Sequence, residues 1–406
     1  MRTLLVAGGV SLIVLLQGYF LPPHTPAPVL PPDLVGDPRW LQESEQLARY
    51  RLPLYVTSLV LPPLVLWGFV RRGAAARLRR RLRERGLRNE WLLVGAYCLL
   101  LWVGLVLLQL PLQYAGYLLR RAYGLSSEPS LTWLGRRAVE AGIEIGAALV
   151  VVEGLYWLLR TFPRRWWLLA SFGSMLLSLF FVYISPIVIT PIFFAQRPLA
   201  DAGLRARIVD LAARVGIEVD DVYVIDASRQ GNEGNAYVTG VGSTTRIVLY
   251  DTLLTDYPHD ELAAVLAHEM AHWRRYHIWQ GLILSFITAP IGFAAAQVIL
   301  RRVLPRWGIR QPADVAGLPF LLLLLSIATL VTLPLQNWQS RRWETEADQI
   351  ALVATGDGPA LARTFARLAR QNRADPTPPR LVEVLFATHP ASGRRVAAVL
   401  GEVANP

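Results

Sequence analysis

Long apolar runs alternate with short polar connections along much of this chain. Seven runs reach roughly the 20 helical residues that cross a bilayer, and they cover residues 3–20, 53–70, 91–111, 142–159, 167–192, 279–300 and 316–336. The first run follows Arg2, as in a signal peptide, but no small-residue cleavage site comes before the proline-rich segment after it. A cleaved leader stays an alternative for this run. The pattern predicts a polytopic membrane protein with about seven transmembrane helices.

Two polar regions interrupt the predicted spans. Residues 195–278 combine a helical pattern with short runs of β-branched and aromatic residues, which predicts a small sheet. Residues 338–356 and 358–372 have helical patterns, and a proline-rich break and a short C-terminal helix follow them. Both regions have the character of a small α+β domain outside the membrane.

The composition agrees with a membrane protein. The chain is 53% hydrophobic and 17% charged, with a mean hydropathy of +0.35. Its formal net charge is +11, but the arginines lie beside apolar runs and not among exposed aromatic residues, which argues against nucleic-acid binding. The single cysteine, Cys98, lies in an apolar run. Any metal site must therefore use histidine, aspartate or glutamate.

The segment "HEMAH" places two histidines four positions apart, on one face of a helix. His268 and His272 can then hold one metal ion, while Glu269 projects beside them towards a bound water. This is the arrangement of zincin peptidases. A polar helix whose histidines only form hydrogen bonds is the alternative. His277, five residues after His272, lies off the ligand face and is interpreted as structural.

A third ligand is expected from the segment "SRRWETEAD", because a catalytic zinc takes three protein ligands and keeps one position open. In a helix, Glu344 and Asp348 share a face and Glu346 points elsewhere. Glu344 can then ligate, and Asp348 can orient a ligand histidine. Two predicted spans separate this segment from the histidines, so both lie on the same side of the membrane. An exposed acidic helix start beside arginines is the alternative.

With these residues assembled, the chain resembles the type I CaaX prenyl protease family, integral-membrane gluzincins that cut peptides next to lipidated cysteines. The similar segments occur in the family's order and extend over most of the chain: "SPIVITPIFF", "NAYVTG", "RIVLYDTLL", "HEMAHWRRYH", "SRRWETEAD" and "THPASGRR". The resemblance implies helices that enclose a water-filled chamber with the metal at one end. It also implies one zinc ion per chain.

The resemblance assigns roles to the residues of these segments. His268, His272 and Glu344 would be the zinc ligands, Glu269 the general base for the attacking water, and Asp348 the group behind the ligands. His389 would be a catalytic helper near the scissile carbonyl, and the substrate would contact Asn235, Ala236 and Arg395. The chain departs from the family just before Asn235, where "EG" replaces the usual His-Ser.

These interpretations combine into a mainly α membrane protein with a small α+β zincin-like catalytic domain. We expect transmembrane helices 1 to 5 in residues 1–192, the first catalytic part with sheet and histidine helix in 193–278, helices 6 and 7 in 279–336, and the second catalytic part in 337–406. The expected function is a monomeric zinc metalloendopeptidase acting on peptides or lipidated peptides, in contact with membrane lipids and without nucleic acid. A quality-control protease with non-prenylated substrates, a transporter or channel with an incidental metal site, and an inactive scaffold are alternatives.

Arginines lie unevenly on the connections between the predicted spans. Among the short connections, one alternate set carries 17 arginines and the other carries seven. In a bacterial inner membrane, the positive-inside rule places the catalytic regions on the non-cytoplasmic side. The resemblance favours the opposite side, because CaaX processing in eukaryotes is cytosolic.

Overall fold

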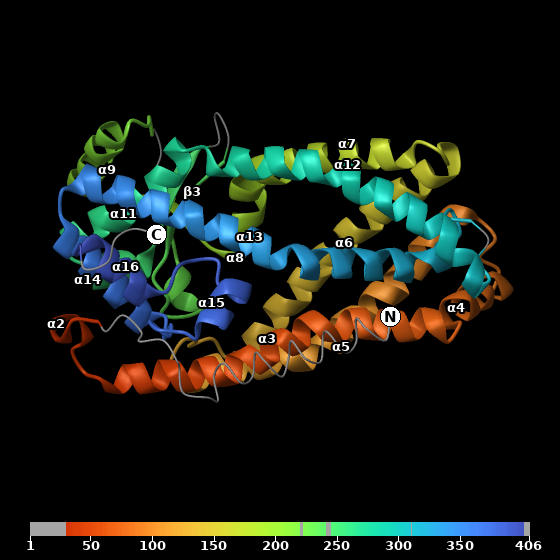
Figure 1. Ribbon diagram of the computed structural model, residues 1–406, viewed down its shortest axis with the longest axis horizontal. Helices are drawn as coiled ribbons and strands as arrows, with labels where there is room; N and C mark the ends of the chain where they lie inside the picture. The colour runs from red at the N-terminus through yellow and green to blue at the C-terminus, as the bar shows by residue number, and fades with distance from the viewer. Residues whose placement is uncertain (1–29, 220–221, 241–244, 310, 402–406) are drawn as a thin grey trace.

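Six helices among the described residues are long and apolar enough to cross a membrane. The computed structural model describes residues 30–219, 222–240, 245–309 and 311–401, and the first predicted span, residues 3–20, lies outside them. The other predicted spans correspond to helices that run along the long axis of the molecule (Figure 1): α3 (Arg39–Arg71), α5 (Glu90–Ala122), α6 (Ser130–Thr161), α7 (Trp166–Ile184), α12 (His277–Val303) and α13 (Leu318–Thr355). The chain is thus a mainly helical, multi-pass membrane protein.

Several of these helices are longer than a bilayer requires. Helices α3 and α5 have 33 residues each and α13 has 38. At about 1.5 Å per residue, each exceeds the roughly 30 Å of the hydrocarbon core. Helix α13 accordingly carries both the last predicted span and the acidic segment after it. One continuous helix therefore links the membrane to the candidate site.

The outer surface of the bundle suits a lipid environment. In each of these helices, at most 22% of the most apolar stretch of 18 residues is buried within the protein. Large apolar side chains such as Leu107, Phe180 and Ile291 are exposed. A surface of this size and character is unfavourable in water and favourable against hydrocarbon chains. Backbone polar groups are satisfied within the helices, as a membrane span requires.

Short elements connect the long helices. Helix α7 continues through a π-helical turn, η1 (Ser185–Ile189), which contains Pro186, into α8 (Thr190–Phe193). Proline removes a backbone donor, which is one cause of such local changes in helical pitch. Arginine-rich α4 lies at the end of the bundle far from the sheet (Figure 1). The remaining connecting elements are α2 (Pro32–Val35), α4 (Ala74–Glu84), η4 (Leu304–Trp307) and η5 (Val315–Gly317).

A sheet-containing region lies at the other end of the molecule (Figure 1). Its sheet has the order β1-β2-β4-β3, in which β2 and β4 are parallel and the other two pairs are antiparallel. Its elements are β1 (Gln196–Pro198), α9 (Ala202–Val215), β2 (Val222–Ile225), η2 (Ala227–Arg229), β3 (Ala236–Thr239), β4 (Arg246–Tyr250), α10 (Asp251–Asp256), α11 (His259–Arg274), α14 (Gly358–Gln371), α15 (Arg380–Phe386) and α16 (Ser392–Val399).

One apolar core holds this region together. Ile247 and Leu249 of β4 are fully buried in this core, and Val248 between them is buried in a smaller cluster on the opposite face of the sheet. Leu266 of α11 and Phe365 of α14 belong to the same core, although about a hundred residues separate them in sequence. The sheet and the end of α13 therefore form a single packed unit around α11.

Candidate metal centre

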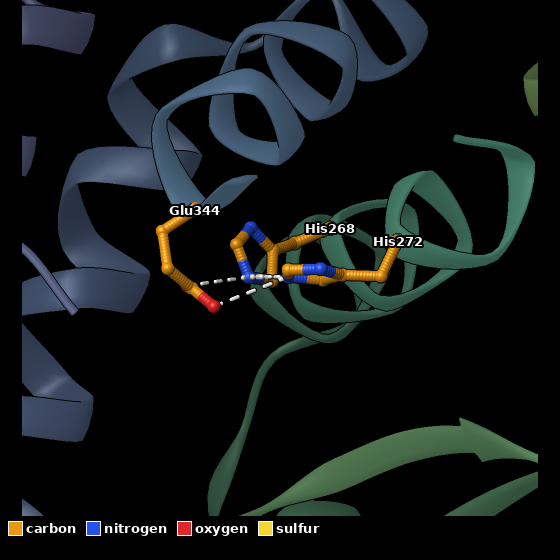
Figure 2. A group of neighbouring side chains, drawn as sticks. All are labelled: His268, His272 and Glu344. Carbon is orange, nitrogen blue, oxygen red and sulfur yellow. Dashed lines mark hydrogen bonds and ion pairs between the residues drawn. The ribbon is translucent and has the colours of Figure 1, made fainter. Parts of the chain in front are cut away.

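Helices α11 and α13 pack against each other and bring the two candidate metal-binding segments together. His268 and His272 lie one turn apart on α11, and Glu344 lies on α13 (Figure 2). Fully buried alanines share these helix faces, at Ala264 on α11 and at Ala347 on α13. Small side chains let two helix axes approach closely, which brings groups from both helices within bonding distance of one point.

Three side chains converge on this point. Nε2 of His268 lies 3.2 Å from Oε2 of Glu344, and Nε2 of His272 lies 3.3 Å from Oε1 of the same carboxylate. The two Nε2 atoms are 3.2 Å apart. His268 and Glu344 are buried. In Figure 2, both rings and the carboxylate point at one another.

The donor set of this cluster fits a zinc ion. Unprotonated imidazole nitrogens and a carboxylate present only lone pairs to one another, so they repel unless a proton or a cation lies between them. Oε2 of Glu344 is buried and has no hydrogen-bond partner. Ligand atoms at the corners of a tetrahedron, with bonds of about 2.0–2.1 Å to zinc, lie about 3.3 Å apart. The two Nε2 atoms lie 3.2 Å apart, and each lies 3.2–3.3 Å from a different oxygen of Glu344, which is close to this spacing.

Asp348 and Arg395 lie behind His268. Nδ1 of His268 is 2.8 Å from Oδ1 of Asp348, and the guanidinium of Arg395 donates to both oxygens of Asp348 at 2.6 and 2.8 Å. Arg395 also stacks over the ring of Phe365, 3.9 Å from its centre. Burial acts to lower the pKa of Arg395, but the charge of Asp348 raises it above its ordinary value. The arginine thus stays charged and holds Asp348 in place.

Arg395 was expected to contact the substrate, but in this structure its guanidinium contacts Asp348. Its side chain is only 12% exposed, and its guanidinium is engaged by Asp348. Nη2 lies 3.9 Å from Oε2 of Glu344, so the charge of Arg395 acts on the ligand cluster. A direct contact with substrate stays a prediction.

His389 lies in the loop between α15 and α16 and faces the cluster. Its Nε2 atom is 3.3 Å from Oε1 of Glu344, and its Nδ1 atom is 2.9 Å from the hydroxyl of Thr388. The side chain is 59% exposed. An exposed imidazole beside the cluster can reach both solvent and a bound molecule.

Glu269 follows His268 on α11, and its side chain is half-buried. No described residue forms a hydrogen bond or an ion pair with its carboxylate in this structure. A carboxylate without such a partner has its lone pairs available for a proton from another molecule.

The predicted substrate edge begins at Asn235. Ala236 is the first residue of β3, which is an edge strand of the sheet and pairs with β4 on one side. The backbone oxygen of Asn235 accepts a hydrogen bond from the amide of Tyr250 at 3.0 Å. Helix α11 also contacts β3. The sheet edge thus lies beside the helix that carries the histidines.

The departure from the family pattern before Asn235 has a structural explanation. Glu233 forms a two-pronged ion pair with Arg120 of α5, at 2.7 and 2.9 Å. A side chain on Gly234 would place its Cβ atom 2.5 Å from Oε1 of Gln371. These two residues join the sheet edge to a membrane helix and to α14. Sequence reasoning did not find this contact, because its partner is more than a hundred residues away.

Sequence reasoning also missed the surroundings of His272. His277 is not in the ligand cluster, but its Nδ1 atom lies 2.8 Å from Nδ1 of His272. The expectation that His277 lies off the ligand face assumed one continuous helix from His268 to His277. In the structure, α11 ends at Arg274 and Tyr276 adopts a left-handed conformation with φ of 56°. The sequence signal that could have indicated this contact is the histidine that follows "HEMAH" five residues later.

The fold and the metal centre define a multi-pass membrane protein with a zincin-type His-His-Glu cluster. Residues 198–403 match Peptidase family M48, and residues 37–195 match the family described as "CAAX prenyl protease N-terminal, five membrane helices". The chain belongs to Peptidase family M48. It is a membrane metalloprotease of that family, for which zinc and peptide substrates are implied.

Curated relatives include both bacterial and eukaryotic proteins. The chain is 31% identical over 294 residues to the "Uncharacterized metalloprotease YhfN" of Bacillus subtilis, covering 71% of this chain and 69% of that protein. It is 31% identical to the "CAAX prenyl protease 1 homolog" of Arabidopsis thaliana, covering 56% and 54%. The "CAAX prenyl protease 1" of Saccharomyces cerevisiae is 33% identical over 44% of this chain and 40% of that one.

A solved structure shares the fold. The crystal structure of S. mikatae Ste24p superposes with a TM-score of 0.82, covering 97% of this chain and 98% of that chain at 22% identity. The expected fold class, and the resemblance to the CaaX prenyl protease family, are thereby confirmed.

Proposed function

We propose that this protein is a zinc endopeptidase that hydrolyses peptide bonds at the membrane, with His268, His272 and Glu344 as the metal ligands. The observation that carries the proposal is the convergence of these three side chains: each histidine Nε2 atom lies 3.2–3.3 Å from an oxygen of Glu344, and one of these oxygens, Oε2, is buried without a hydrogen-bond partner. When bound, zinc supplies a Lewis acid that polarises the attacking water and the substrate carbonyl.

The residues of the chain perform the proton transfers. Glu269 would take the proton of the attacking water as a general base and pass it to the leaving amine. His389 donates a hydrogen bond from Nε2 to the developing oxyanion, while Thr388 holds its other nitrogen. The position of His389 beside Glu344 supports this role.

The edge of β3 would bind the substrate backbone. An extended peptide can add to an edge strand through main-chain hydrogen bonds, and α11 lies against this strand. Asn235 and Ala236 would align the peptide so that its scissile bond reaches the cluster. Arg395 would influence the bound substrate indirectly, because its positive charge holds Asp348 and lies near the carboxylate of Glu344.

Two substrate classes are consistent with this chemistry. The eukaryotic relatives are named CAAX prenyl proteases, which supports peptides next to a lipidated cysteine. The bacterial relative is named only as a metalloprotease, which supports non-prenylated membrane proteins as the second candidate.

A single comparison tests the proposal. The purified full chain is loaded with zinc and offered one peptide in two forms, with and without a farnesyl group on its cysteine. We expect cleavage that a chelator abolishes and that zinc restores, and the ratio of kcat/KM for the two forms assigns the substrate class. Cleavage that persists after complete zinc removal, or a zinc-loaded chain that cuts neither form, would contradict the proposal.

We also propose that the metal centre faces the non-cytoplasmic side of a bacterial inner membrane. The arginine-rich helix α4 lies at the end of the bundle opposite the sheet-containing region (Figure 1). Arginine-rich connections stay in the cytoplasm during insertion, which supports this orientation.

A further inference from the structure

A second line of contacts leads from the metal centre through His272. Nδ1 of His272 lies 2.8 Å from Nδ1 of His277, and Nε2 of His277 lies 3.2 Å from Oε2 of Glu346. The other oxygen of Glu346 is 2.5 Å from Nε of Arg275. Four side chains, from the C-terminal end of α11, the start of α12 and the C-terminal half of α13, are thus joined in series.

The positions of the hydrogens in this series follow from the chemistry of imidazole. If Nε2 of His272 holds a cation, that nitrogen carries no hydrogen, so Nδ1 carries it and donates to His277. Nδ1 of His277 must then accept, so its Nε2 atom carries the hydrogen and donates to Glu346. The carboxylate accepts from both His277 and Arg275. With both rings neutral, this is the arrangement in which every contact of the series has one donor and one acceptor.

His277 is held rigidly in this position. Its side chain is only 4% exposed, and its ring stacks on Trp343 at 5.2 Å with 17° between the planes. The indole nitrogen of Trp343 donates to Gln280 at 3.0 Å. The left-handed turn at Tyr276 directs the first residue of α12 back towards the last turn of α11. A fixed imidazole of this kind can define the orientation of its neighbour.

The two histidine ligands thus have matching support. His268 contacts Asp348, which pairs with Arg395. His272 contacts His277, which contacts Glu346, and Glu346 pairs with Arg275. Each line ends in a carboxylate held by an arginine. Such partners fix the tautomer and the ring orientation of a metal-bound histidine, and their loss typically lowers metal affinity by about 10- to 100-fold.

We propose that His277 and Glu346 are positioning residues that hold His272 in its metal-binding tautomer and orientation. The inference rests on the proposed function of His272 as a zinc ligand. It assigns to Glu346 a task beyond a surface ion pair, although its side chain is 34% exposed.

Two substitutions at His277 separate hydrogen bonding from packing. In His277→Asn, the amide oxygen occupies the position of Nδ1 and still accepts from His272, whereas His277→Leu fills a similar space without an acceptor. We expect His277→Leu to weaken zinc binding by about 10- to 100-fold and His277→Asn to keep affinity within a few-fold of the wild type. A merely structural histidine that stacks on Trp343 would be replaced as well by leucine as by asparagine.

Substitutions at Glu346 test the next member of the series. Glu346→Ala should weaken zinc binding less than His277→Leu, and adding it to His277→Leu should cause no further loss, because it acts through His277. Asp260→Ala is the matched control, since Asp260 forms an exposed ion pair with Arg363 at 2.7 Å on the first turn of α11. This control should leave zinc affinity unchanged.

The measurements are zinc affinity, by chelator competition on the purified full chain, and the visible spectrum of the cobalt-loaded chain, which reports ligand geometry. Equal zinc affinity in the wild type, His277→Leu and Glu346→Ala would overturn the inference, as would equal losses in His277→Leu and His277→Asn. A wild-type chain that binds no zinc would instead overturn the proposed function, so the two failures are distinguishable.

Discussion

Asp348 orients His268 from the same helix that supplies Glu344 to the cluster. The carboxylate lies 2.8 Å from Nδ1 of His268, which leaves Nε2 of that ring facing Glu344 at 3.2 Å. Glu344 and Asp348 are four residues apart on α13 and so lie on one face. One turn of this helix therefore supplies both a proposed ligand and the group that orients another.

Arg395→Met should destabilise the folded protein. The substitution leaves the carboxylate of Asp348 buried without its cationic partner, and breaking a buried pair in this way costs about 3–5 kcal/mol. Arg80→Met is the control, because Arg80 pairs with Glu84 on the surface, where both side chains are about two-thirds exposed, and should change stability by about 0–1 kcal/mol. Denaturation of both variants in detergent compares the two, and equal stabilities would contradict the prediction.

Glu269→Gln should separate metal binding from catalysis. The amide cannot take a proton from water, so hydrolysis should fall by about 100- to 10,000-fold. Zinc content should stay at the wild-type level, because Glu269 is not in the ligand cluster. Metal analysis and peptide cleavage on the same preparation check both parts. Loss of zinc from this variant would show that Glu269 is a ligand.

Glu344→Ala should abolish tight zinc binding, because it leaves only two histidines at the site. We expect a loss larger than the roughly 100-fold that removal of an orienting partner causes. Thr345→Ala changes the next residue of the same helix, whose hydroxyl bonds only to the backbone oxygen of Arg341 at 3.0 Å among the described residues, and should keep full affinity. If both variants retained zinc, this segment would not contribute a ligand.

Reporter fusions should locate the metal centre relative to the membrane. Alkaline phosphatase fused after residue 406 should be active, and green fluorescent protein fused there should not fluoresce, if the sheet-containing region is non-cytoplasmic. Fusions after residue 88, next to the arginine-rich helix α4, should give the reverse result. A fluorescent fusion at the C-terminus with an inactive phosphatase would place the metal centre in the cytoplasm.

The local parts of the site could be predicted because helix geometry relates residues three or four positions apart. The spacing of His268 and His272 put both rings on one face, and that of Glu344 and Asp348 did the same on a second helix. Apolar runs of about 20 residues located the membrane helices for a similar reason, since the bilayer sets their length. An even number of spans between the two segments placed them on the same side.

The contacts that hold the proposed ligands in place depend on the tertiary structure and do not follow from these local rules. His277 faces His272 because the helix ends between them and the backbone turns through a left-handed residue at Tyr276. Arg395 reaches Asp348 only because α16 packs against the end of α13. Sequence alone determined which groups this protein offers to a metal ion. Packing between distant segments decided which side chains hold those groups in place, because for residues far apart along the chain the sequence separation does not determine the distance in space.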